Sequence, residues 1–391
     1  MKKELFHGRN LRRYELGAAV LLLAVLVVWG LALHLSEPDR EATAARKRMF
    51  AVAKVVDILA DSAEAQDWTE GRRIGEQRIE VELLSGPYKG TCLETLNYLN
   101  AYVNVDAGLG GRIIVRLDLD DRGEPYIISI PSHDRSWMLL GLAAVFAALL
   151  VIIGGKKGLM ALLGLLYTLA AVWCILVPMV LRGADPVAVT IGIVALTTAA
   201  SLLALTGFSR KTLCAALGCV GGTTAAGLFA AAAGTISPIN GFNMSEAEEL
   251  VLRSTQGDIQ ISGLLVSGIL IASLGAVMDV AMSIASACSE LRTLNPELGA
   301  GALFRSGMNI GRDAMGTMAN TLILAFAGAS LNVLLLLRVY DYPLIQIINT
   351  DAMVIELLRG LSGSIGIMLT VPLAAALSAR LMPAKKGGKK G

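Results

Sequence analysis

From Trp137 to Leu381 the chain is a succession of apolar segments separated by short charged or glycine-rich breaks. The segments are about 20 residues long, which is the length of helix that crosses the ~30 Å hydrocarbon core of a bilayer. Hydrophobic residues make up 54% of the 391 residues, and the mean hydropathy is +0.62. A soluble domain of this length has too little interior to bury so much apolar sequence. The segments therefore predict a bundle of membrane-spanning helices.

An eighth apolar run precedes this region, over residues 16–35, and follows a basic stretch. A secretory signal peptide has the same order, but its apolar region is shorter and ends in small residues. Here the run ends in Leu33-His34-Leu35-Ser36-Glu37, so we expect an uncleaved first helix. The predicted fold class is an α-helical polytopic membrane protein with about eight spans. The seven later helices are expected at 137–154, 159–181, 187–207, 213–234, 261–286, 314–337 and 357–381.

Residues 36–136 differ in kind, being rich in charge and free of long apolar runs. Apolar and polar residues alternate over 77–83, 112–119 and 126–130, between glycine and proline turns, and this pattern is typical of short strands with one buried face. Helical phasing precedes them over 44–60. A small β-rich domain, closed as a barrel or an OB-like fold, is expected because closure removes exposed strand edges.

Basic residues in the short breaks orient the chain, because cytoplasmic loops of membrane proteins are enriched in lysine and arginine. With the N-terminus inside, the predicted cytoplasmic segments hold most of them, whereas the opposite loops hold Arg182, Arg253 and Arg338, with Arg359 near a helix start. We therefore expect a bacterial cytoplasmic membrane protein with both termini cytoplasmic. Its parts are 1–35 (first helix), 36–136 (extracytoplasmic domain), 137–381 (seven-helix bundle) and 382–391 (basic tail).

Composition also limits which kinds of binding site and reaction are expected. The net charge of +2 gives no indication of nucleic-acid binding. Of the five cysteines, only Cys92 lies outside the apolar region, so no disulfide framework is expected. The three histidines all precede residue 137, which excludes a histidine-based metal site in the bundle. No catalytic constellation is recognisable, and we expect neither an enzyme nor a cofactor.

Polar residues deep in apolar helices are costly, about 2.5–3.5 kcal/mol for a carboxylate at a helix centre on insertion scales. In the helix expected at 261–286, Gly275, Asp279, Ser283 and Ser286 recur at helical spacing and share one face. An acid in such a position is more often functional than structural. Asp279 is therefore the leading candidate site residue.

A second polar strip lies on the next helix, where Asn309, Asp313, Gly316 and Asn320 share a face, with Thr317 beside them. We expect a short surface helix from Pro296 to about residue 306, and then a new helix start near Asp313. Asp279 and Asn320 would then both lie about 10 Å below the inner membrane surface and could meet.

Simpler interpretations exist for several of these residues. Ser283, Ser286 and Thr317 are typical of interhelical hydrogen bonding, and glycines such as Gly275, Gly316 and Gly363 of close helix packing. Asp313 could equally be an acid at a helix N-terminus, favoured by the helix dipole. Asp279 has no comparable structural explanation.

The stretch Leu274-Gly275-Ala276-Val277-Met278-Asp279-Val280-Ala281-Met282-Ser283, followed by Ser306-Gly307-Met308-Asn309-Ile310-Gly311-Arg312-Asp313-Ala314-Met315-Gly316-Thr317-Met318-Ala319-Asn320, closely resembles the YibE/F-like bacterial membrane proteins. The similarity is expected to cover nearly the whole chain. It implies a multi-pass membrane protein and names no substrate. The arrangement of the acid and the outside domain also resembles that of the proton-driven RND and SecD/SecF translocation proteins, by analogy of layout only.

Two functions from different classes follow. The first is a transporter or ion/proton-coupled translocator of an unknown small molecule or ion, with coupling at Asp279, Ser283, Asp313, Thr317 and Asn320. The second is a membrane scaffold or assembly factor whose outside domain binds a protein partner. The bilayer is the expected environment in both cases, and a homo-oligomer is compatible with either.

Overall fold

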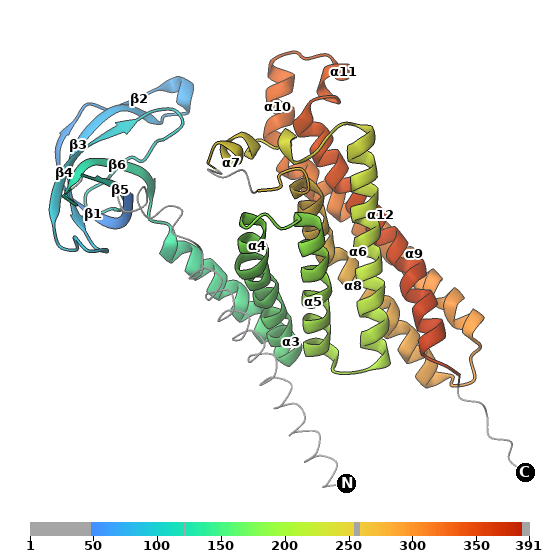
Figure 1. The fold of residues 1–391 in the computed structure, drawn as a ribbon. Coiled ribbons are helices and arrows are strands. Elements are labelled where there is room, and N and C mark those ends of the chain that lie inside the picture. Colours follow the sequence, from blue (N-terminus) through green and yellow to red (C-terminus); the bar gives the residue numbers. More distant parts are fainter. Residues whose placement is uncertain (1–47, 121, 254–258, 385–391) are drawn as a thin grey trace, which may run out of the picture. The chain divides into compact units, whose positions relative to one another are not determined.

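The computed structural model describes residues 48–120, 122–253 and 259–384. The chain divides into two compact units, one ending at Leu149 and the other beginning at Leu150 (Figure 1). The first is a β unit followed by the start of a helix, and the second is helical. The helix expected at 16–35 lies outside the described residues.

The β unit is one antiparallel sheet with the strand order β2-β3-β1-β5-β6. The remaining strand, β4, lies off this path and also pairs with β3. The predicted strands at 77–83, 112–119 and 126–130 are confirmed as parts of β3, β5 and β6. Strand β4 was not predicted. The strands are β1 (Arg48–Asp61), β2 (Glu64–Ala65), β3 (Arg73–Leu83), β4 (Cys92–Leu99), β5 (Arg112–Leu119) and β6 (Pro125–His133), with a short helical turn η1 (Asp67–Thr69) after β2.

The helical phasing expected over 44–60 is wrong for the described part of that range, where β1 begins at Arg48. Ala51, Ala53 and Val55 alternate as buried residues along this strand. Ala53 pairs with Leu83 of β3 on one side and Ile113 of β5 on the other. A central strand with two partners gains ladder hydrogen bonds and packing from both, and these outweigh the helical preference of its alanines.

The sheet curls so that β4 and β6 approach each other. Thr95 Oγ1 on β4 donates to the Ile128 carbonyl on β6 at 3.0 Å, but no backbone pairing joins these two strands in the described part of the unit. The result is a half-barrel around an apolar core. The closed barrel or OB-like fold that we expected is not established. The core residues are Ala51, Ala53, Val55, Ile79, Val81, Leu83, Val105, Ala107, Ile113, Val115, Leu117, Leu119 and Ile130.

Five helical stretches among the described residues are long and apolar enough to cross a membrane, or six if the bent pair α9 and α10 forms one span. The predicted count of about eight is not confirmed, and the first of the expected spans lies outside the described residues. The helices are α3 (Ser136–Ala171), η2 (Val172–Leu176), α4 (Val177–Leu181), α5 (Pro186–Thr206), α6 (Arg210–Ile236), η3 (Gly241–Asn243), α7 (Ala247–Arg253), α8 (Leu264–Leu294), α9 (Ala300–Ala329), α10 (Leu331–Val339), α11 (Leu344–Ile347) and α12 (Asp351–Leu381).

The helical stretch from Ser136 to Leu181 is broken at Gly155. This residue has φ 55° and ψ −132°, which is not a helical conformation. A Cβ placed on Gly158 would lie 1.9 Å from the carbonyl oxygen of Leu150, although eight residues of straight helix rise about 12 Å. The helical path therefore bends back on itself here, at the break predicted between 154 and 159.

Helix α9 differs most from the prediction. We expected a surface helix at 296–306 and a separate helix from 314, with Asp313 near its start. Instead α9 runs without interruption from Ala300 to Ala329, so Asp313 lies in mid-helix, and the break falls at Ser330, where α9 and α10 meet at 51°. Gly307 and Gly311 are tolerated inside α9 because α8 and α12 pack closely over them.

Helix α12 packs against α6, α8 and α9 and lies at the core of the helical unit (Figure 1). Small residues allow this close approach. A Cβ on Gly366 would lie 2.7 Å from Ala226 Cβ of α6, and one on Gly363 would lie 2.6 Å from Leu322 Cδ2 of α9. By contrast, Cβ atoms on Gly275 and Gly316 would meet nothing within 4 Å. These two expected packing glycines therefore contact no other helix in the described chain, because they lie on outward faces.

Candidate functional site

Asp279 lies at the midpoint of α8, 15 residues from each end. Its side chain is exposed, and Gly268, Ala272, Gly275 and Ser283 on the same face are exposed as well. The opposite face of α8 carries the buried residues that pack on α5, α6 and α12. We call this outward row of small and polar residues the α8 strip.

Helix α9 has a corresponding row. Its buried positions include Leu303, Gly307, Gly311 and Ala319, and they face α8 and α12. Helical geometry of 100° per residue puts the polar residues on the opposite side. We call this second outward row the α9 strip; all of its members are exposed, namely Asn309, Arg312, Asp313, Gly316, Thr317 and Asn320.

The contacts between the helices set their register. A Cβ on Gly307 would lie 3.0 Å from Cys288 Sγ, and one on Gly311 would lie 3.0 Å from Ile284 Cδ1. The two helices are antiparallel, so a residue five positions after Gly311 lies level with one five positions before Ile284. Gly316 is therefore level with Asp279. Asn320 lies four residues further, about 6 Å along the axis.

The expected meeting of Asp279 and Asn320 is not found. Among the described residues, the α8 strip and the α9 strip share no hydrogen bond or ion pair. Thr317 Oγ1 donates to the Ala314 carbonyl at 2.9 Å, and Arg312 Nη1 donates to Asn309 Oδ1 at 3.4 Å, both within α9. Both helices are also longer than predicted, because α8 continues to Leu294 and α9 begins at Ala300.

An outward acid at the middle of an apolar helix cannot rest against lipid at low cost. A charged side chain at the centre of a span costs about 2.5–3.5 kcal/mol on insertion scales, and the amides and hydroxyls of the two strips also need partners. The strips must therefore be covered by water or by protein. Among the described residues, no group of three or more histidine, cysteine, aspartate or glutamate side chains is placed to hold a metal ion.

A polar pocket of about 880 Å³ opens at the end of the bundle where α9 breaks. It contains three acidic residues and one arginine, together with amide and hydroxyl groups. Ala329 and Ser330 at the break belong to its wall. The lining residues are Asn243, Met244, Ser245, Glu246, Ala329, Ser330, Val333, Gln346, Asn349, Thr350, Asp351, Ala352, Ile355, Glu356 and Arg359.

The charges of this pocket are partly paired. Arg359 Nη1 lies 2.6 Å from Glu356 Oε1, and Asn243 Nδ2 donates to Asp351 Oδ2 at 2.9 Å. A hydrogen bond from Ser245 lowers the pKa of Glu246, and the Arg359 guanidinium adds to this effect. With three carboxylates against one guanidinium, the pocket favours cationic or polar solutes over anions.

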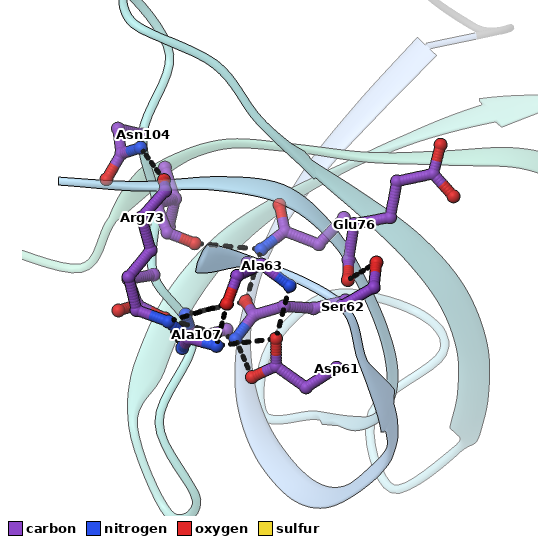
Figure 2. A network of polar contacts seen from close by, with 11 residues as sticks. Asp61, Ser62, Ala63, Arg73, Glu76, Asn104 and Ala107 are labelled. Atoms are coloured by element: carbon purple, nitrogen blue, oxygen red, sulfur yellow. Dashed lines mark hydrogen bonds and ion pairs between the residues drawn. The ribbon is translucent and has the colours of Figure 1, made fainter. Parts of the chain in front are cut away.

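A buried polar network in the β unit was missed by the sequence analysis. The Gln77 amide is buried and makes four hydrogen bonds: Nε2 donates to Asp61 Oδ2 and Asp106 Oδ1, and Oε1 accepts from Asn97 Nδ2 and Ala107 N. Figure 2 shows Asp61, the last residue of β1, close to Arg73, Ala63 and Ala107.

Arg73 completes this network by bonding Asp61 Oδ1 at 2.6 Å and Asp106 Oδ1 at 3.0 Å (Figure 2). The sequence contained a sign of this network, because Gln77 lies two residues before Ile79, in the same inward-facing series as Val81 and Leu83. Every polar atom named here has a partner, so the network ties the loop before β5 to β3 and offers no free ligand group.

Residues 142–384 match the model of the family described as YibE/F-like protein. The match covers more than half of the chain. The chain belongs to the YibE/F-like family. Family membership and the apolar helices together indicate a membrane protein. Neither the curated proteins nor the solved structures gave a match to it.

In this YibE/F-like protein the matched region contains the α8 strip, the α9 strip and the acidic pocket. It leaves out residues 1–141, and with them the β unit and its Gln77 network. The expected similarity over nearly the whole chain is therefore shown for the helical part only. The features that belong to the family's common region are the ones on which a functional proposal should rest.

Proposed function

We propose that this protein is an ion- or proton-coupled translocator of the bacterial cytoplasmic membrane, with Asp279 as its coupling residue. The observation that carries the proposal is the outward position of Asp279 at the midpoint of α8, where no described residue forms a hydrogen bond or ion pair with it. A carboxylate that alternately binds and releases a cation changes the charge of a span by one unit. Each charge state then favours different surroundings for the α8 strip, and this difference can couple cation binding to movement of the helices.

Neighbouring residues would complete the path. Ser283 lies one turn from Asp279 on the α8 strip, and Thr317 lies beside Gly316, which is level with Asp279 in the α8–α9 register. Their hydroxyls, with the Asn320 amide, can solvate an ion or carry a chain of water between the two strips. Asp313 lies one turn nearer the Ala300 end of α9, at the side we assign to the cytoplasm.

The orientation rests on the distribution of basic residues, with both termini in the cytoplasm. It puts the acidic pocket at the extracytoplasmic end of the bundle. A broken helix beside such a pocket resembles the interrupted spans that line transporter cavities. We therefore assign the pocket as the outer vestibule, in which cations gather before they reach the strips.

The proposal is tested by reconstituting the full chain in liposomes that contain a pH-sensitive dye and imposing a membrane potential. The wild type should move protons faster than empty vesicles, and Asp279→Asn should abolish the difference. Glu297→Gln, which changes an exposed acid in the α8–α9 connection, should retain wild-type flux. The proposal fails for protons if wild type and Asp279→Asn both behave like empty vesicles, and the same assay with Na⁺ or K⁺ gradients then tests the remaining monovalent ions.

The alternative function, a membrane scaffold or assembly factor, is favoured by one feature of the β unit. Strand β4 and the loop after it expose Leu96, Tyr98, Tyr102 and Val103, and Tyr102 is 96% exposed. Exposed aromatic residues are frequent at protein interfaces. A photo-crosslinking residue at position 102 of the full chain should then capture one specific protein. Capture that persists in Asp279→Asn, together with zero flux in the wild type, would favour the scaffold.

A further inference from the structure

A second pocket lies at the opposite end of the bundle, where α5 ends, α6 begins, and α8 and α12 end. Its volume is about 460 Å³. Three basic side chains and four hydroxyl groups line it, and its lining contains no carboxylate. We call it the basic pocket; its residues are Thr206, Ser209, Arg210, Lys211, Ser289, Arg292, Thr293, Met382 and Pro383.

Arg292 is the informative residue of this pocket. Its Nη1 donates to the Leu298 carbonyl, but Nε and Nη2 are buried and have no hydrogen-bond partner. A guanidinium keeps its charge at any physiological pH, so it cannot escape this cost by losing a proton. Buried charged groups without partners are strongly unfavourable. An acceptor that is not part of the described chain is therefore expected at this fork.

The surrounding groups favour an anion in the same place. Arg210 and Lys211 form no ion pair with a described carboxylate, and they open the 27-residue helix α6, whose N-cap is Ser209. The first N–H groups of a helix and its dipole attract negative charge. Three other helices end here and contribute about half a negative charge each, which the three full positive charges outweigh.

We propose that the basic pocket binds a phosphate group, either that of an anionic phospholipid headgroup or that of a soluble phosphate. The free Nε and Nη2 of Arg292 form the planar fork that pairs with two phosphate oxygens. The Ser289 hydroxyl, which also lines the pocket, offers a further hydrogen-bonding group. The pocket lies at the end of the bundle that we assign to the cytoplasm, and basic pockets between helices on that side are typical sites of anionic headgroups. This proposal does not depend on transport through Asp279.

Two probes distinguish the sources. The purified full chain in neutral detergent is mixed with phosphatidylglycerol or with phosphatidylcholine, and native mass spectrometry counts the lipid that each chain retains. Equilibrium dialysis with radiolabelled inorganic phosphate measures the soluble arm. Selective retention of phosphatidylglycerol supports the headgroup, and saturable binding of inorganic phosphate supports the soluble group.

Arg292→Gln should weaken whichever binding is found by about tenfold or more, as the loss of a charge-assisted hydrogen bond predicts. Arg305→Gln, which changes an exposed arginine of α9 outside the pocket, should leave it unchanged. Because Arg292→Gln could fail to fold, Lys211→Gln and Ser289→Ala provide milder variants that should each weaken binding. The proposal is overturned if neither probe binds, or if these variants bind as well as the wild type.

Discussion

Gly311 of α9 lies against Ile284 of α8, so closely that a Cβ on the glycine would be 3.0 Å from Ile284 Cδ1 and 2.3 Å from Val371 Cγ1 of α12. This contact joins three helices and sets the register that brings Gly316 level with Asp279. It also turns the polar residues of α9 away from the bundle, because they occupy the opposite side of the helix. The position of the candidate site is therefore a consequence of how one glycine packs.

Replacing Gly311 tests this packing directly. Gly311→Ala should destabilise the protein by about 1–3 kcal/mol, because the added methyl overfills a tight contact. Gly316→Ala is the matched control on the same helix, where a Cβ meets nothing within 4 Å. It should be neutral or stabilising by up to about 1 kcal/mol, since alanine favours a helix over glycine. Thermal unfolding in a single detergent measures both. An equal loss for Gly316→Ala would mean that protein packs tightly on the α9 strip.

Water should reach the strips if they line a path. Cysteines introduced as Ser283→Cys and Thr317→Cys should react with a hydrophilic maleimide about tenfold faster than Leu369→Cys, because thiolate, the reactive form, needs water to ionise. Leu369 is an exposed apolar residue of α12 and serves as the lipid-facing control.

Few native cysteines have to be replaced before the maleimide experiment. Cys214, Cys219 and Cys288 are buried, so only the exposed Cys92 and the half-buried Cys174 must be replaced. Labelling of positions 283 and 317 as slow as that of position 369 would contradict an aqueous path and favour coverage by another helix.

The Gln77 network should stabilise the loop before β5. Gln77→Ala leaves the buried Asn97 amide and the Ala107 N–H without this partner, and we expect a loss of about 2–4 kcal/mol from the local stability. Hydrogen exchange of the full chain should show faster exchange over residues 100–110. Glu76→Gln is the control, because the Glu76 side chain is exposed and makes no bond in the network. Unchanged exchange in Gln77→Ala would show that the network contributes little.

The same region should weaken in acid. A hydrogen bond from Arg73, aided by those from Gln77 and the Ala63 N–H, lowers the pKa of Asp61 from 3.8 to about 2. Because the folded pKa is depressed, the stabilisation is present above about pH 4 and is lost as the pH falls towards 2. Exchange over residues 61–77, corrected for intrinsic rates, should rise across this interval. In Asp61→Asn that rise should be absent, and a rise of equal size in the variant would assign it to another acid.

Much of the secondary structure could be predicted from local patterns. Alternation over Arg112–Leu119 predicted β5, and the apolar runs predicted α5 and α6 within a few residues. Strand β1 was assigned as a helix because its alanines and valines are compatible with either structure, and only pairing on both sides decides between them. The start of α9 was misplaced for a related reason, since its internal glycines resemble helix ends until the packing of α12 is known.

The sequence alone determined that this protein is built from apolar helices, that its polarity concentrates on one face each of α8 and α9, and that Asp279 lies deep within its helix. Periodicity fixes which residues share a face, because that depends only on helix geometry. It cannot fix what the face meets, because a polar row can turn inward to a neighbouring helix or outward to water or another chain. Tertiary structure decided that question. The small residues on the opposite faces, Gly307 and Gly311 above all, allow α8, α9 and α12 to pack closely, and this packing turns both strips outward.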